Sequence, residues 1–285
     1  MTEFIQALEA FPFLRLALGA GLLASVSCGV VGTFVVTRRM TVVAGSLAHS
    51  VLGGIGAAHY LHVVRGWTWL HPLHGALFAA LLAAMIIGWV RDRGREREDT
   101  VISALWAVGM ATGVLFLFRT PGYQADLMTY LFGNIVVVDP GELRLLVGVD
   151  VIVLAVVVAF WNPLLAVSYD EEFARLRGVN VPAVTTLLLA LTGLAIVTLV
   201  AMVGVVMVIA LVTLPAATAG RFTRRLSHTM VAAVILTALL TTGGLALSFQ
   251  ADLPTGATTI MLTASVYALA HLVSAGRDRV RRRRP

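Results

Sequence analysis

The chain has 285 residues, of which 59% are hydrophobic and 13% are charged, whereas a soluble domain is about 25% charged. This composition excludes an ordinary soluble fold and predicts an integral membrane protein. The formal net charge is +6, and the 21 basic residues are all arginines, so the chain lacks the lysine that a Walker-type nucleotide loop requires. The single cysteine, Cys28, excludes an internal disulfide.

Apolar segments near the length that a bilayer core needs, about 20 residues, recur along the whole chain. We therefore predict an all-α, polytopic bundle of transmembrane helices. By the positive-inside rule the arginine-rich clusters face the cytoplasm. Counting the apolar segments between them predicts about nine spans, with the amino terminus outside and the carboxyl terminus cytoplasmic. The clusters lie at residues 38–39, 91–99, 170–177, 221–225 and 277–284.

The chain is expected to form one transmembrane domain over residues 1–285, with an exposed lead at 1–13 and a basic cytoplasmic tail at 277–285. We expect the tail to bind anionic lipid head groups rather than nucleic acid. The piece at 130–134 is too short to cross and predicts a half-helix on the outer side. The uncharged tract at 181–220 predicts two crossings that turn near residues 201–204, although one span with a re-entrant piece is an alternative.

Residues 170–178 predict a short, well-capped helix in a cytoplasmic connection. Asp170 can cap the helix, Glu171 and Glu172 lie in its first turn, arginines lie in its last turn, and Gly178 ends it. Such a helix could transmit motion from a partner protein. A solvated connector that follows ordinary capping rules is the alternative.

Five motifs, taken in order, resemble the metal-ion permeases of ABC importers, the family that takes up zinc, manganese or iron. The first is Arg38-Arg39-Met40 followed by a helix of small residues with one histidine. The resemblance covers roughly residues 14–272, and the other motifs lie at residues 131–133, 169–178, 203–219 and 254–257.

The resemblance implies a homodimer of permease chains, two ABC ATPase subunits below it, and an extracytoplasmic metal-binding protein that delivers the ion. It also implies that residues 170–178 form the coupling helix that contacts the ATPase. The residues that would carry this role are Asp170, Glu171, Glu172, Phe173, Ala174 and Gly178.

His49 is the candidate metal ligand on the small-residue helix. Many family members have an aspartate four residues earlier, which would share one helix face with the histidine and could bind the same divalent ion. This chain has Gly45 at that position. A neutral imidazole still binds zinc, iron or nickel. The alternative is a structural histidine that bonds to a neighbouring helix.

Four further histidines predict a second group at the outer end of the bundle. His59 and His62 lie three residues apart, and His71 and His74 repeat the spacing after the following turn. Each pair shares a helix face, and the turn could bring the pairs together to receive a divalent ion. The alternative is that these imidazoles are interfacial residues at a wet helix end.

Asp150 is predicted to lie about two turns inside a span that begins at Glu142. It could pair with His49 or His271 and supply the missing carboxylate. A contact with water or with a serine is the alternative.

The predicted function is therefore the permease subunit of an ABC importer for a divalent transition metal, zinc or manganese, in the inner (cytoplasmic) membrane. The metal is substrate, no cofactor is bound stably, and ATP is held by the partner subunit, so the chain is not an enzyme. Two alternatives remain: an ion-gradient-driven carrier, which usually has several carboxylates near the midplane, and an ABC permease for a metal chelate such as a siderophore or cobalamin.

Overall fold

The computed structural model describes residues 2–94, 97–121 and 139–282, and every regular element in this part of the chain is a helix. The half-helix predicted at 130–134 lies outside the described residues. The elements are α1 (Thr2–Ala10), α2 (Pro12–Thr37), α3 (Thr41–Arg65), α4 (Pro72–Arg93), α5 (Glu98–Arg119), α7 (Pro140–Ala159), α8 (Trp161–Tyr169), α9 (Glu171–Leu176), α10 (Val181–Val203), α11 (Val205–Phe222), α12 (Leu226–Ala251) and α13 (Thr255–Arg282).

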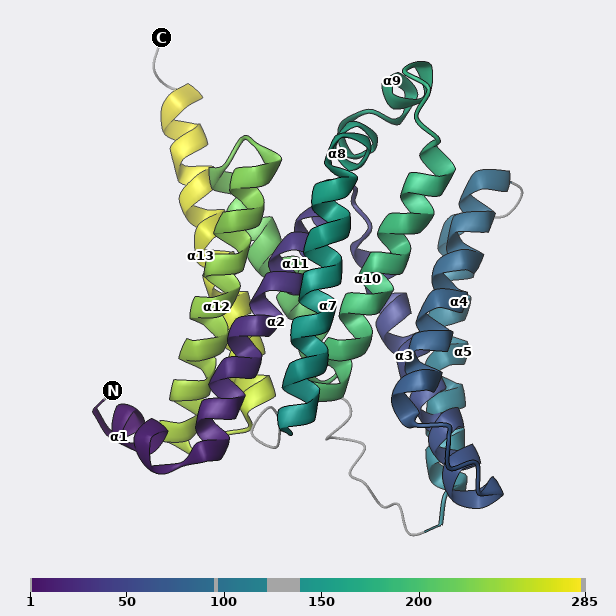
Figure 1. Cartoon of the computed structure of the whole chain (residues 1–285). Coiled ribbons are helices and arrows are strands. Elements are labelled where there is room, and N and C mark those ends of the chain that lie inside the picture. The colour runs from purple at the N-terminus through teal and green to yellow at the C-terminus, as the bar shows by residue number, and fades with distance from the viewer. Residues whose placement is uncertain (1, 95–96, 122–138, 283–285) are drawn as a thin grey trace.

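Eight helices of the described residues are long and apolar enough to cross a membrane. The pair α7 and α8 also qualifies when taken together, although it bends by 75° where one helix meets the next, so the bundle has up to nine spans. The all-α polytopic bundle is thereby confirmed. Figure 1 shows α1 and the last turns of α13 at opposite ends of the bundle, as an odd number of crossings requires.

Single residues set the breaks between helices. Gly204 has a φ of 83°, which favours glycine, and it separates α10 from α11. The tract at 181–220 therefore contains two helices, as predicted. Asp139 caps α7 by accepting a hydrogen bond from the amide of Gly141 at 2.8 Å, while Glu142 bonds back to the Asp139 amide. The amino-terminal lead forms α1, in which Phe4 is buried and packs edge to face on Phe249 of α12.

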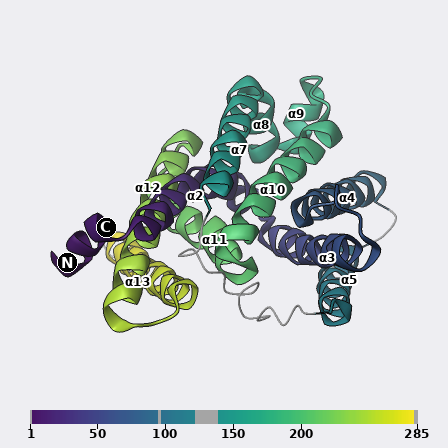
Figure 2. The same ribbon diagram turned by 60° about the horizontal axis from the view of Figure 1, so that its bottom comes forward.

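The helices form two groups that α10 connects. In one group α2 packs on α7, α11 and α12, and α13 covers α11 and α12. In the other, α3 packs on α4 and α5, and we name these three helices the α3–α5 group. Helix α10 packs on α2 and α7 and also on α3 and α4. Figure 2 shows the α3–α5 group to one side of the remaining helices.

Glycines bring the backbones of the α3–α5 group into close contact. A Cβ atom at Gly53 of α3 would lie 2.7 Å from the carbonyl oxygen of Gly109 of α5. One turn further along α3, a Cβ at Gly56 would lie 2.7 Å from the carbonyl oxygen of Gly113. These approaches are too close for any side chain, and small residues at helix interfaces are what allow membrane helices to associate tightly.

Replacing Gly109 with alanine should weaken the bundle. The new Cβ would lie 2.7 Å from the Cα of Ser50 on α3, so α5 must move away from α3. We expect a loss of about 1–3 kcal/mol in the free energy of unfolding, measured by thermal unfolding in detergent. The control is Gly148→Ala on α7, where no atom lies within 4 Å of the new Cβ. Equal unfolding temperatures for the two variants would contradict this packing.

Candidate functional site

His49 lies on α3 with 8% of its surface exposed. Its Nδ1 atom lies 2.9 Å from the carbonyl oxygen of Gly45, one turn earlier on the same helix. Because a carbonyl only accepts hydrogen bonds, this contact requires the hydrogen on Nδ1. In the neutral ring Nε2 then carries the free lone pair, which is the arrangement of a metal-binding imidazole oriented by a backbone carbonyl.

The ring of Trp106, on α5, lies against His49. The two ring centroids are 4.5 Å apart and the ring planes make an angle of 27°, so the rings are stacked. Sequence reasoning missed Trp106, because nothing in the local pattern of α5 relates it to a histidine 57 positions earlier. The available signal was Gly45 itself, since a position without a side chain leaves room for a large neighbour.

Gly45 and Trp106 fit together sterically. A Cβ atom at Gly45 would lie 2.6 Å from the Cζ3 atom of Trp106 and 2.9 Å from its Cη2 atom. The indole therefore occupies the space that the side chain of an aspartate at position 45 would enter. The site around His49 thus has an aromatic ring in the place where the family resemblance leads one to expect a carboxylate.

Serines on either side of His49 complete its polar surroundings. Ser46 donates a hydrogen bond to the carbonyl oxygen of Ile102 on α5 at 3.0 Å, and Ser50 donates to the carbonyl oxygen of Ser46 at 2.9 Å. The Ser46 bond crosses from α3 to α5. It therefore holds Trp106 and His49 in register, because both helices are fixed one turn from the stacked rings.

Three of the outer histidines make helix-cap or turn contacts. His71 accepts a hydrogen bond from the amide of Leu73 at 3.4 Å, and His74 accepts one from the amide of His71 at 3.2 Å, so both cap α4. His62 lies 3.2 Å from the carbonyl oxygen of Trp67. His59 precedes it by one turn of α3. Among the described residues no three histidine, cysteine, aspartate or glutamate side chains gather closely enough to hold a metal ion. Metal capture by these histidines stays a prediction.

Asp150 is 5% exposed and lies inside α7. Its Oδ1 atom accepts a hydrogen bond from the hydroxyl of Ser27 on α2. The structure thus gives Asp150 a serine partner, at the contact between α2 and α7.

Residues 170–178 contain the short helix α9, as predicted. Asp170 accepts a hydrogen bond from the amide of Phe173 at 2.9 Å, and Gly178 follows the helix with a φ of 80°. Ala174 is fully buried against α8 and α10, whereas Phe173 is 55% exposed and Leu176 is 87% exposed. Helix α9 therefore exposes two large apolar side chains beside the charged Glu172 and Arg175. It lies at the tip of the bundle, where Figure 1 shows it.

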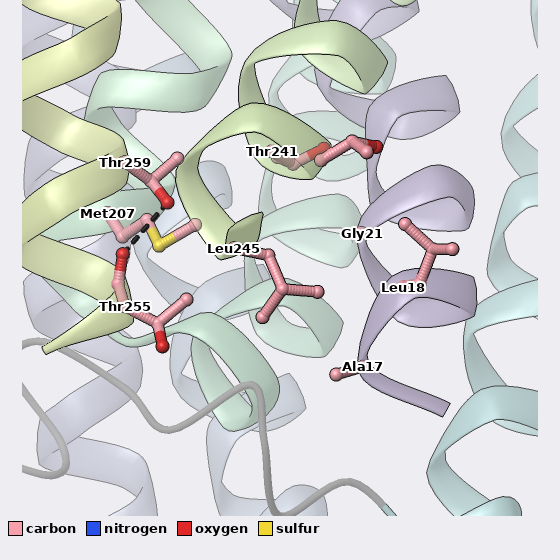
Figure 3. A pocket seen from close by; sticks show the side chains of 9 residues that line it. Ala17, Leu18, Gly21, Met207, Thr241, Leu245, Thr255 and Thr259 are labelled. Carbon is pink, nitrogen blue, oxygen red and sulfur yellow. Dashed lines mark hydrogen bonds between the residues drawn. The ribbon is translucent and has the colours of Figure 1, made fainter. Parts of the chain in front are cut away.

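A cleft at the opposite end of the bundle is lined by none of the residues predicted to bind metal (Figure 3). It is too narrow to admit a water molecule. The hydroxyl of Thr259 donates a hydrogen bond to the carbonyl oxygen of Thr255 at 2.8 Å, and the hydroxyl of Thr241 donates one to the carbonyl oxygen of Thr237. Both hydroxyls therefore bond within their own helices. The lining residues are Ala17, Leu18, Gly21, Met207, Thr241, Thr242, Leu245, Thr255 and Thr259.

These features define a polytopic helical membrane protein with one buried, oriented histidine and an exposed short helix at one end. The model of the ABC 3 transport family matches residues 10–274, and the chain belongs to that family. It is therefore the membrane permease of an ABC transporter, in which a separate subunit hydrolyses ATP.

Three similar proteins cover nearly the whole chain. A probable metal transport system membrane protein of Chlamydia trachomatis is 35% identical over 92% of this chain and 88% of its own length. The manganese transport system membrane protein MntC of Halalkalibacterium halodurans is 30% identical over 96% of this chain and 91% of its own length. The structure of PsaBC from Streptococcus pneumoniae in complex with Fab matches with a TM-score of 0.83 and 28% identity, over 94% of each chain.

Proposed function

We propose that this chain is the permease subunit of an ABC importer for a divalent transition metal ion, zinc or manganese. The observation that carries the proposal is His49, a buried imidazole whose Nε2 is free to bind an ion. Family membership supports the ATP-driven mechanism, and the relatives described as metal or manganese transport proteins support the class of substrate.

We propose further that the α9 end of the bundle faces the cytoplasm and the α1 end faces outward. The arginine pattern supports this orientation, because Arg38 and Arg91 meet Glu171 of α9 at that end. Helix α9 would then dock on the ATPase through its exposed Phe173 and Leu176. An extracytoplasmic metal-binding protein would deliver the ion at the other end, and two copies of this chain would form the pathway.

The ligand chemistry at His49 favours zinc over manganese. Imidazole suits zinc, iron and nickel, whereas carboxylate and water suit manganese. The indole of Trp106 lies where a carboxylate at position 45 would extend. A passing ion would therefore meet a nitrogen ligand beside an aromatic face and no negative charge from this position.

Replacing His49 with alanine should abolish most metal-dependent activity. We expect uptake and metal-stimulated ATP hydrolysis to fall by about tenfold or more, because the ion loses its nitrogen ligand. The assay uses the purified chain with its ATPase and delivery protein in lipid vesicles, with zinc and manganese supplied separately. The control is His271→Ala, an exposed histidine on α13. Unchanged uptake in His49→Ala would remove this residue from the pathway.

Restoring a carboxylate at position 45 should require removal of the indole. The single variant Gly45→Asp places its side chain in the space of Trp106, so we expect it to lose uptake of both metals. The double variant Gly45→Asp, Trp106→Ala should regain uptake and shift the preference between competing ions toward manganese by about tenfold. Trp106→Ala alone is the control. If all three variants kept the zinc-to-manganese ratio of the natural chain, the ion would not pass this point.

A further inference from the structure

Four charged side chains form a cluster at the α9 end of the bundle. One carboxylate oxygen of Glu171, Oε1, accepts hydrogen bonds from the guanidinium groups of both Arg38 and Arg91, the latter at 2.9 Å. The other terminal nitrogen of Arg91 lies 3.7 Å from the carboxylate of Glu98. The cluster therefore alternates two positive and two negative groups, with Glu171 between the arginines.

The guanidinium of Arg38 is the buried member of this cluster. Its side chain is 3% exposed, compared with 28% for Arg91 and 37% for Glu171. Its second terminal nitrogen donates a hydrogen bond to the hydroxyl of Thr185 on α10 at 3.1 Å. Burial lowers the pKa of Arg38, nearby Arg91 lowers it further, and Glu171 opposes both effects. Because a buried charge without its partner is strongly unfavourable, Arg38 and Glu171 are expected to move together.

The cluster lies where α3, α4 and α5 have their ends nearest to α9. Arg38 lies in the three-residue corner before α3, Arg91 lies in the last turn of α4, and Glu98 is the first residue of α5. Glu171 is the member that comes from α9. Glycine contacts bring α3 backbone to backbone with both α4 and α5, so the cluster lies at the shared end of one packed unit.

We propose that Glu171 is the positioning residue through which a displacement of α9 reaches the α3–α5 group and the metal site. His49 lies eight residues into α3, about 12 Å along the helix from the corner that Arg38 occupies. Trp106 travels with it on α5. The inference rests on the proposed function, in which α9 docks on the ATPase. In this inference the charged cluster connects the docking of α9 to the metal site at His49.

The experiment measures the number of metal ions imported per ATP hydrolysed, with the complete complex of this chain, its ATPase and its delivery protein in lipid vesicles. Glu171→Gln keeps the shape of the side chain and removes its charge. We expect this ratio to fall by about fivefold or more, because ATP-driven motion of α9 no longer carries the α3–α5 group. Glu171→Asp, which keeps the charge, should recover part of the ratio.

Asp92→Asn is the matched control, because Asp92 is an exposed acid next to Arg91 at the same end of the bundle. It should keep the ratio of the natural complex. A change in protein stability alone would lower the amount of complex and leave the ratio per ATP unchanged, so the ratio separates positioning from folding. Should Glu171→Gln fail to assemble, Arg91→Gln weakens the same cluster at a more exposed position and should lower the ratio in the same direction.

The outcomes separate this inference from the proposed function. If the natural complex imports no metal on ATP hydrolysis, the proposed function fails. If the natural complex imports metal and Glu171→Gln, or Arg91→Gln in its place, keeps the full ratio, the proposed function stands and the positioning role of Glu171 is overturned.

Discussion

The close approach of α3 and α5 is the contact on which the candidate site depends. Lipid tails are as apolar as the side chains of these helices, so hydrophobic burial alone gives them no reason to associate. Glycines at Gly53 and Gly109 instead allow backbone contact, where many weak dispersion contacts add up. At this spacing the indole of Trp106 stacks on His49. The packing of two helices therefore determines the surroundings of the imidazole.

Those surroundings distinguish this chain from the pattern that the resemblance led us to expect. An aspartate beside the histidine would bring a negative charge to offset a divalent ion in a low-dielectric pathway. Gly45 and Trp106 bring none, although the face of an indole ring attracts cations. Binding at this point is therefore expected to be weaker and to depend on the nitrogen ligand, which suits an ion that must leave as readily as it enters.

The sequence predicted the elements well and the contacts between them poorly. Length and apolarity located the spans, Gly204 marked a break between helices, and the charges of residues 170–178 predicted α9. Trp106 lies 57 positions from His49 in the chain. Arg38 and Arg91 lie 133 and 80 positions from Glu171. Helices that are apolar on every side carry no periodic signal for the face that meets a neighbour, so the stacking of Trp106 on His49 could not be derived from spacing. The charge pattern predicted that Arg38, Arg91 and Glu171 lie at the same end of the bundle, but it could not predict which of these groups pair.

The two kinds of contact suit different parts of a transport cycle. Close-packed interiors resist deformation, so the proposed mechanism keeps the glycine contacts of α3 with α4 and α5 intact while the group moves. The ion cluster of Glu171 lies at the partly exposed tip, where water can solvate its outer members once they separate. Arg38 alone is sealed from water, so its bond to Glu171 is the one that resists separation. In the proposed mechanism a force applied to α9 would therefore reach first the corner before α3, the helix that carries His49.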